Sequence, residues 1–152
     1  DAPMPLGQRE DVYVVALFRR CFGGCSIHSE MVMSMGLTPS SEISQRLANA
    51  HLVISRSGAT TVHEVAAAGR PAIFVPLAVH ADDQQAKNAR LLTDSGAAKL
   101  VREGDSAATE IASHLTNMLD NPSQLSDMAS LARSNALLGA AEKLADMVEQ
   151  ET

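Results

Sequence analysis

Short apolar runs alternate with helix-length segments through the middle of this 152-residue chain, and this alternation limits the possible folds more than any other feature. Residues 51–55 and 72–75 are almost continuously apolar, as expected of strands buried on both faces of a sheet, and 97–101 is a shorter candidate. The segments 59–68 and 82–95 between them have the length of crossover helices. The pattern predicts an α/β fold: a Rossmann-like parallel sheet with flanking helices.

Helical patterns also lie on both sides of these strand–helix repeats. Ser41 to Ala50 carries apolar residues on one face, and the 59–68 segment is followed by Gly69 and Pro71, which commonly end a helix. After residue 105 the apolar period is helical only, with a break at Asn121-Pro122. The expected apolar stripes are Ile111, Leu115 and Met118, then Leu125, Met128 and Ala132, then Leu144, Met147 and Val148.

Residues 1–40 fit no clear pattern. We treat them as an unplaced N-terminal segment that could belong to the same sheet, ahead of a Rossmann-like domain over 41–152. Within this segment, Tyr13 to Phe18 could form a strand, and Met31 to Met35 a helix or a strand end.

The composition excludes some classes of partner. The chain has 12 Lys and Arg against 18 Asp and Glu, with three Phe, one Tyr and no Trp, so a nucleic-acid partner is not expected. No apolar run approaches the roughly 20 residues of a membrane span, and no secretory signal is visible. These features favour a cytoplasmic location.

Two cysteines and a histidine form a C-x3-C-x2-H cluster at Cys21, Cys25 and His28. A zinc site would need a fourth ligand, and the sequence offers no clear one. The simpler interpretation is two small apolar side chains and a surface histidine, so we expect neither a metal nor another cofactor.

A small polar loop, Arg56-Ser57-Gly58, follows the first expected strand and precedes a helix. Ligands of open α/β sheets bind at the carboxyl ends of the strands, and a helix N-terminus there favours an anion. Thr60, Thr61 and Glu64 share a helix face, and a carboxylate can accept hydrogen bonds from two ribose hydroxyls. The alternative is that Ser57 caps the helix and Glu64 is a solvated acid.

A second polar cluster follows the next expected strand. Gln84 or Gln85 together with Asn88 should lie at the same sheet edge, where side-chain amides suit sugar hydroxyls. We therefore expect the 51–55 and 72–75 strands to be adjacent and parallel, with Ser57 and Gln85 at one edge. Simpler roles are a helix cap for Asp82 and an ordinary loop position for His80. Together the two loops predict a nucleotide-sugar site.

The stretches SRSGATTVHEVAAAGRPAIFVPL and DDQQAKNARLLTDSGAA resemble the donor-binding half of the MurG-type peptidoglycan glycosyltransferases, which have the GT-B fold. Enzymes of this family transfer GlcNAc from UDP-GlcNAc to undecaprenyl-pyrophosphoryl-MurNAc-pentapeptide (lipid I), which yields lipid II. The resemblance extends from about Ser41 to the C-terminus. It implies the donor half of a GT-B fold and a UDP-GlcNAc-dependent hexosyltransferase as the intact protein.

The resemblance also implies roles for individual residues. Glu64 corresponds to the residue that holds the ribose hydroxyls. The other implied UDP-GlcNAc-binding residues are Ser57, Gly58, Ala59 and Thr60 beside the phosphates and sugar, Gln84, Gln85 and Asn88 at the GlcNAc hydroxyls, and Arg56, which belongs to the motif without a clear role. No catalytic base is expected here, because the nearby His63 and His80 both have ordinary explanations.

The family pattern is incomplete in this chain. An acceptor domain has no counterpart, and Gly23-Gly24 lies too close to the SRSG motif to be the family's glycine-rich phosphate loop. The resemblance therefore implies an acceptor-binding GT-B domain in cis or trans, which brings the lipid-linked acceptor, at the inner face of the plasma membrane. The chain could be a fragment, a split subunit or a degraded gene product. Alternatives for its function are a separate donor subunit of a two-chain GlcNAc transferase and a non-catalytic nucleotide-sugar-binding module.

Overall fold

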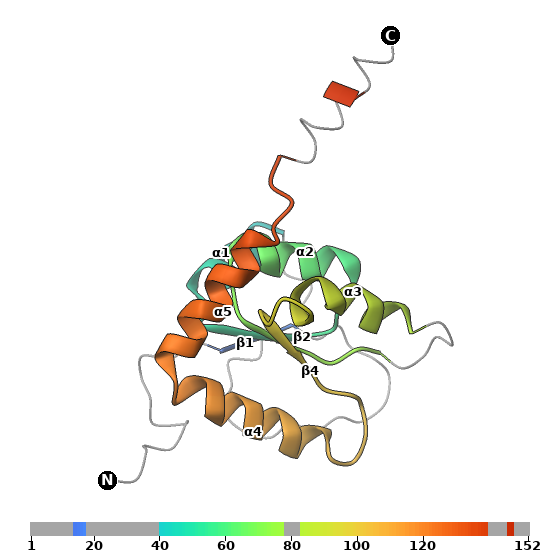
Figure 1. Ribbon diagram of the computed structural model, residues 1–152. Helices are drawn as coiled ribbons and strands as arrows, with labels where there is room; N and C mark the ends of the chain where they lie inside the picture. Colours follow the sequence, from blue (N-terminus) through green and yellow to red (C-terminus); the bar gives the residue numbers. More distant parts are fainter. Residues whose placement is uncertain (1–13, 18–39, 78–82, 140–145, 148–152) are drawn as a thin grey trace.

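A four-stranded parallel sheet forms the centre of the molecule (Figure 1). The computed structural model describes residues 14–17, 40–77, 83–139 and 146–147. The strands β1 (Val14–Leu17), β2 (Leu52–Ser55), β3 (Ala72–Phe74) and β4 (Ala98–Leu100) lie side by side in chain order. Ile54 pairs with Ala16 on one side and Ile73 on the other, so β2 and β3 are adjacent and parallel as predicted.

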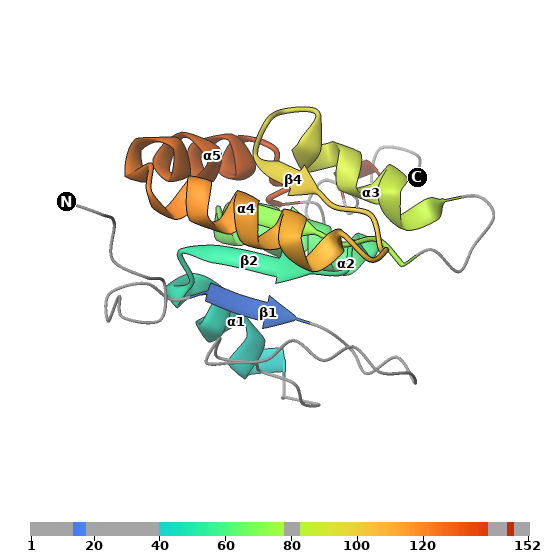
Figure 2. The ribbon, with the colours of Figure 1, turned by 90° about the horizontal axis from the view of Figure 1, so that it is seen from below.

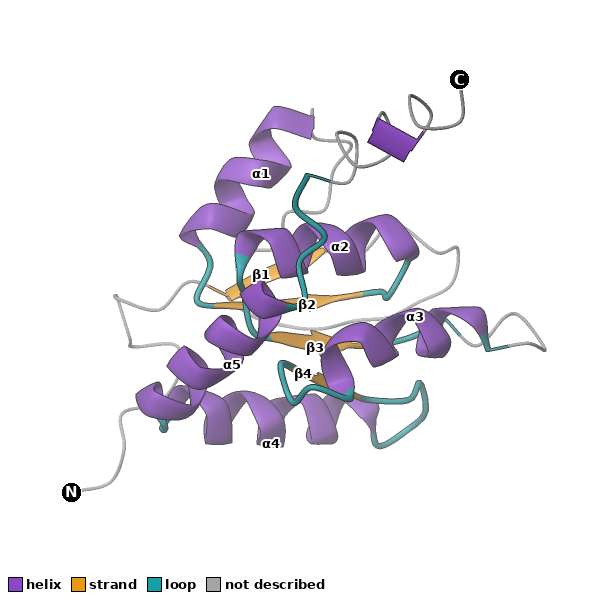
Figure 3. Cartoon of the chain, turned by 45° about the horizontal axis from the view of Figure 1, so that its top comes forward, coloured by secondary structure: helices purple, strands orange, loops and turns teal. Residues whose placement is uncertain are grey.

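Helices cover both faces of this sheet (Figures 2 and 3). One face packs against α1 (Ser40–Asn49), α2 (Ala59–Ala68) and α3 (Gln84–Thr93), and the other against α4 (Ala107–Leu119). The fifth helix, α5 (Pro122–Ser134), contributes Met128 to one core cluster and Ala132 to the other. Because both faces are buried, alternate residues of β2 enter opposite clusters, with Val53 in one and Leu52 and Ile54 in the other.

The predicted α/β fold, a Rossmann-like parallel sheet with flanking helices, is confirmed. Helix α2 has the predicted bounds, and its C-cap residue Gly69 adopts a left-handed conformation with φ 61°. The apolar stripes of α4 and α5 are also confirmed, since Leu115, Met118, Met128 and Ala132 are all buried.

Helix α3 begins later than predicted. The sequence pattern places its start at Asp82, but Asp83 has φ 53° and therefore lies outside the helix. Asp83 is the residue that precedes the first turn, and its side chain makes no capping hydrogen bond. The carboxylate binds Arg102 instead.

Several predictions concern residues outside the described ranges. These are the Cys21, Cys25 and His28 cluster, Gly23-Gly24, the 31–35 segment, His80, the proposed cap Asp82 and most of the last helical stripe. The strand expected within 13–18 is present as β1, paired with β2. The division of the chain at residue 40 stays a prediction.

Candidate functional site

The carboxyl end of β2 runs into the loop Arg56-Ser57-Gly58, and α2 begins at Ala59. Gly58 is the residue before the first turn, with an extended backbone (φ −62°, ψ 149°), and no side chain caps this helix. The alternative in which Ser57 caps α2 is therefore wrong. The first N–H groups of a helix need partners other than the helix itself, so this end suits an anion.

Ser57 is fully buried, and its hydroxyl has no hydrogen-bond partner among the described residues. The hydroxyl of Ser55 at the end of β2 shares both properties. Buried polar groups in native proteins are nearly always hydrogen-bonded, so both hydroxyls need a partner that the described residues do not supply. Ser57 directly precedes the uncapped end of α2, so both observations concern the same place.

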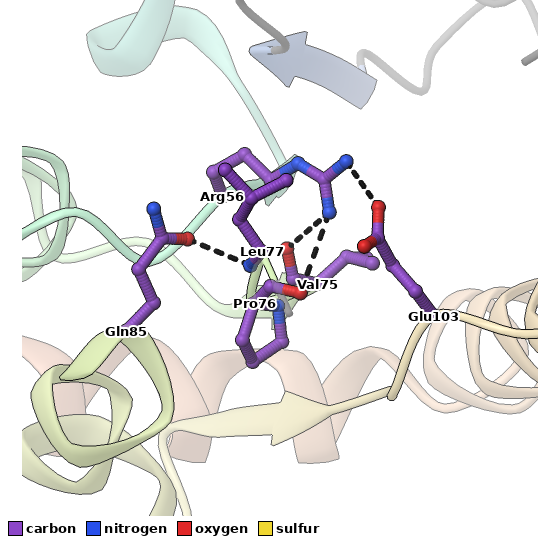
Figure 4. A network of polar contacts seen from close by, with 6 residues as sticks. All are labelled: Arg56, Val75, Pro76, Leu77, Gln85 and Glu103. Atoms are coloured by element: carbon purple, nitrogen blue, oxygen red, sulfur yellow. Dashed lines mark hydrogen bonds and ion pairs between the residues drawn. The ribbon is translucent and has the colours of Figure 1, made fainter. Parts of the chain in front are cut away.

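Arg56 reaches across the carboxyl ends of the neighbouring strands (Figure 4). Its Nη1 donates to the carbonyl of Val75 at 3.0 Å and to that of Pro76 at 3.4 Å, and its Nη2 pairs with Glu103 after β4. The Arg56 side chain is only 22% exposed. In this conformation Arg56 links its own loop to the segments that follow β3 and β4.

The polar side chains of α3 point to the same loops. Asn88 donates from Nδ2 to the carbonyl of Ser57 at 3.2 Å and accepts from Gln84 at 3.3 Å. Gln85 accepts a hydrogen bond from the backbone N–H of Leu77 at 2.9 Å (Figure 4). The predicted meeting of Ser57 and Gln85 at one sheet edge is confirmed, and α3 holds both loops.

The remaining predicted residues lie along α2. Ala59, Thr60 and Glu64 are exposed, and Gly58 is half-buried. Thr60 and Glu64 are one helical turn apart, and Glu64 lies about 7 Å along the axis from Ala59 at 1.5 Å per residue. Their part in binding stays a prediction.

A second charged pair borders the site. Arg102 donates two hydrogen bonds to the Asp83 carboxylate, at 2.7 and 2.6 Å. These hydrogen bonds hold the pKa of Asp83 below its ordinary value of 3.8 and raise that of Arg102, while the charges of Arg102 and Lys87 act on Asp83 in the same direction. Both side chains are largely solvent-exposed.

Sequence reasoning does not identify Asp83, Arg102 and Glu103 as neighbours of the site. The signal that could have found the last two is their place directly after β4, at the same sheet edge as the other loops. No group of three or more potential metal ligands lies together in the described ranges, and none of the helices described is long and apolar enough to span a membrane.

The family model of the glycosyltransferase family 28 C-terminal domain matches residues 27–150. The chain is similar to proteins named "UDP-N-acetylglucosamine--N-acetylmuramyl-(pentapeptide) pyrophosphoryl-undecaprenol N-acetylglucosamine transferase". The one from Phenylobacterium zucineum is 51% identical over 109 residues, which cover 72% of this chain and 30% of the relative. The one from Caulobacter vibrioides is 48% identical over 104 residues, with 68% and 29% covered.

The fold is also similar to a solved structure, the crystal structure of Acinetobacter baumannii MurG. The match has a TM-score of 0.61 at 38% identity and covers 71% of this chain and 31% of that one. The chain thus spans about 30% of the length of the relatives it matches.

Proposed function

Because the chain belongs to the family of glycosyltransferase family 28 C-terminal domains, we propose that it is the UDP-GlcNAc-binding half of a MurG-type glycosyltransferase with the GT-B fold. The relatives' name describes transfer of N-acetylglucosamine to a lipid-linked acceptor. The proposed reaction of the intact protein is transfer of GlcNAc to lipid I, which yields lipid II for peptidoglycan.

One observation carries the assignment of a donor phosphate to this edge. Like those of α3, α4 and α5, the N-terminus of α2 has no side-chain cap, and next to it alone the buried Ser57 hydroxyl has no partner among the residues described. The first N–H groups of a helix have no partner within the helix, so together with a nearby hydroxyl they suit a pyrophosphate, and the helix dipole adds to the attraction. We place the pyrophosphate of the donor beside Ser57, Gly58, Ala59 and Thr60.

The nucleoside and sugar follow from the surrounding side chains. Glu64, exposed on the second turn of α2, accepts hydrogen bonds from the ribose hydroxyls. Gln84, Gln85 and Asn88 surround the GlcNAc hydroxyls, and Gln85 and Asn88 also connect α3 to Leu77 and Ser57 through hydrogen bonds. Arg56 contributes through the same loops.

The chemistry of this half is stabilisation of the leaving group. As the acceptor hydroxyl attacks the anomeric carbon, the glycosidic bond to UDP breaks, the configuration inverts and negative charge develops on the pyrophosphate. Oriented N–H groups at the helix end stabilise that charge. The base that takes the acceptor proton, and the binding of the lipid-linked acceptor, belong to an acceptor domain in cis or trans at the cytoplasmic face of the membrane.

Calorimetry tests the binding part of this proposal. The chain is titrated with UDP-GlcNAc, UDP and uridine. The two phosphate-containing ligands should bind, and uridine much more weakly, since it lacks the group placed at α2. Equal affinity for uridine and UDP, or no binding of UDP at millimolar concentration, would contradict the proposal.

A transfer assay tests whether sugar transfer needs an acceptor domain in addition to this chain. With labelled UDP-GlcNAc and a lipid I analogue, this chain alone should give no product, because orientation of both substrates supplies a large share of the rate. Addition of a matching acceptor domain should restore transfer. Turnover by the isolated chain, lost on His80→Ala, would show that the base lies here after all.

A further inference from the structure

The loop after β4 carries two adjacent residues of opposite charge, and each contacts a different part of the candidate site. Arg102 binds Asp83 through two hydrogen bonds, and Glu103 pairs with Arg56. Asp83 directly precedes α3, and Arg56 begins the loop that leads into α2. One short loop therefore contacts both strand-to-helix connections of the site.

Each contact involves a residue of the proposed site or one next to it. The Arg56 guanidinium, held by Glu103, also donates to the Val75 carbonyl, and Figure 4 shows how these bonds join the loops after β2, β3 and β4. The Asp83 carboxylate lies one residue before Gln84 and two before Gln85. Asp83 is also the only non-glycine residue with positive φ among those described, so its conformation needs support from its surroundings.

We propose that Arg102 and Glu103 form a charge clamp that sets the position of the two site loops relative to each other. In this role they are positioning residues, because they act through Asp83 and Arg56 and not by contact with the donor. The inference rests on the proposed function for its ligand. It adds a third loop to the site, from a part of the sequence that the motifs do not include.

The direction of the change in anion affinity distinguishes the charge clamp from a purely electrostatic effect. Asp83 and Glu103 are both negative, and each borders the proposed site, Asp83 at the start of α3 and Glu103 through its ion pair with Arg56. By Coulomb's law alone, removal of either carboxylate should make an anion bind more tightly. If the carboxylates are needed to hold the loops, the same substitutions should make it bind less tightly.

Two variants test this sign in the full chain. Asp83→Asn keeps the size and tolerates positive φ, and Glu103→Ala removes an exposed side chain, so both should fold. We expect each to weaken UDP binding by about two- to fivefold in calorimetry, the range of exposed ion pairs, and uridine binding to change less. UDP affinity that stays the same or rises in both variants would overturn the clamp.

Matched controls remove the same charges elsewhere. Asp94→Asn lies at the other end of α3, and Glu110→Ala on the exposed side of α4. Both should leave UDP affinity within twofold of the original chain. Equal losses in the controls and the test variants would show that the effect does not depend on the position of the carboxylate, and this would overturn the clamp.

Amide hydrogen exchange gives a readout that needs no ligand. In Asp83→Asn the N–H of Leu77, bonded to Gln85 at 2.9 Å, should exchange faster. In Glu103→Ala the same holds for the N–H of Val75, bonded to the Ser55 carbonyl at 2.8 Å. If the original chain binds no UDP, the proposed function fails, yet these rates still decide the clamp. Unchanged exchange at both amides would reject it.

Discussion

The two edges of the sheet are built in different ways. At the amino edge the helices end in turns closed by backbone hydrogen bonds: Gly69 donates to Ala66, and Ala97 to Leu92. At the carboxyl edge the loops are held by side chains of Arg56, Gln85 and Asn88. Arg70 adds a side-chain bond to the Ala48 carbonyl at the amino edge, and its Nε is buried without a partner among the described residues. The carboxyl edge differs in carrying two such buried hydroxyls, those of Ser55 and Ser57. This difference supports the proposal that the carboxyl edge binds the ligand, whereas the amino edge serves the fold.

The largest expected effect belongs to the carboxyl edge. Glu64→Ala should weaken UDP binding by about 1–3 kcal/mol, the usual loss for a hydrogen bond to a charged group, and leave the thermal midpoint unchanged. Calorimetry of the two proteins measures it, with Glu110→Ala as the control for an exposed helical glutamate. Equal affinities would mean that Glu64 is an ordinary surface acid and that the ribose does not bind at α2.

The amino edge should respond in the opposite manner. Gly69→Ala puts a Cβ on a residue with φ 61°, and that atom would stand 2.8 Å from Nε of Arg133. We expect a loss of about 1–2 kcal/mol in the free energy of unfolding, with UDP affinity unchanged. The control is Gly104→Ala, because no atom of the described residues, apart from its chain neighbours, lies within 4 Å of the added Cβ. Urea unfolding that shows equal stability for both variants would contradict this account.

Two serines, one at each edge of the sheet, test this difference directly. Ser57→Ala removes a buried hydroxyl without a partner among the described residues, so the free energy of unfolding should rise by up to about 1 kcal/mol while UDP affinity falls by a similar amount. Ser95→Ala, at the amino edge, removes a hydroxyl that donates to the Leu92 carbonyl at 3.0 Å. That variant should lose stability and keep its affinity. The comparison fails if both serines change stability in the same direction.

The sequence predicts which loops of this site lie together better than it predicts the hydrogen bonds between them. Parallel strands place their carboxyl ends together, so the amino-acid pattern alone is enough to expect Ser57 and Gln85 at one edge. The bond from Asn88 is not predictable in this way, because its acceptor is the backbone carbonyl of Ser57, 31 residues away. The late start of α3 is not predictable either, because nothing in the sequence DDQQ indicates the left-handed conformation of Asp83.

The charge clamp of Arg102 and Glu103 also cannot be predicted from the sequence. Arg102 and Glu103 follow a strand that is shorter than its apolar pattern predicts, and in sequence they resemble any solvated pair. Their partners, Asp83 and Arg56, lie in loops after other strands. Only the order of the sheet brings the three loops together, and that order is a property of the whole chain.

The smallest effect concerns the pH range over which the carboxyl edge keeps its arrangement. The hydrogen bonds from Arg102 lower the pKa of Asp83 below its ordinary value of 3.8, with further help from the charge of Lys87. A carboxylate with a lowered pKa contributes fully above its ordinary value, and the contribution is lost as the pH falls through the lowered one. Asp83 should therefore act equally from about pH 8 to pH 5.

The ratio of dissociation constants between Asp83→Asn and the original chain isolates this group, because all other ionisable side chains are common to both proteins. UDP-GlcNAc is the suitable ligand, since its pyrophosphate is a diester and lacks the ionisation near pH 6 of a terminal phosphate. The ratio should stay constant from about pH 8 to pH 5 and approach one only as the pH falls through the lowered pKa of Asp83, with circular dichroism to verify that both proteins remain folded. A ratio that already changes between pH 8 and pH 5 would mean that another group, and not the carboxylate bound to Arg102, holds the start of α3.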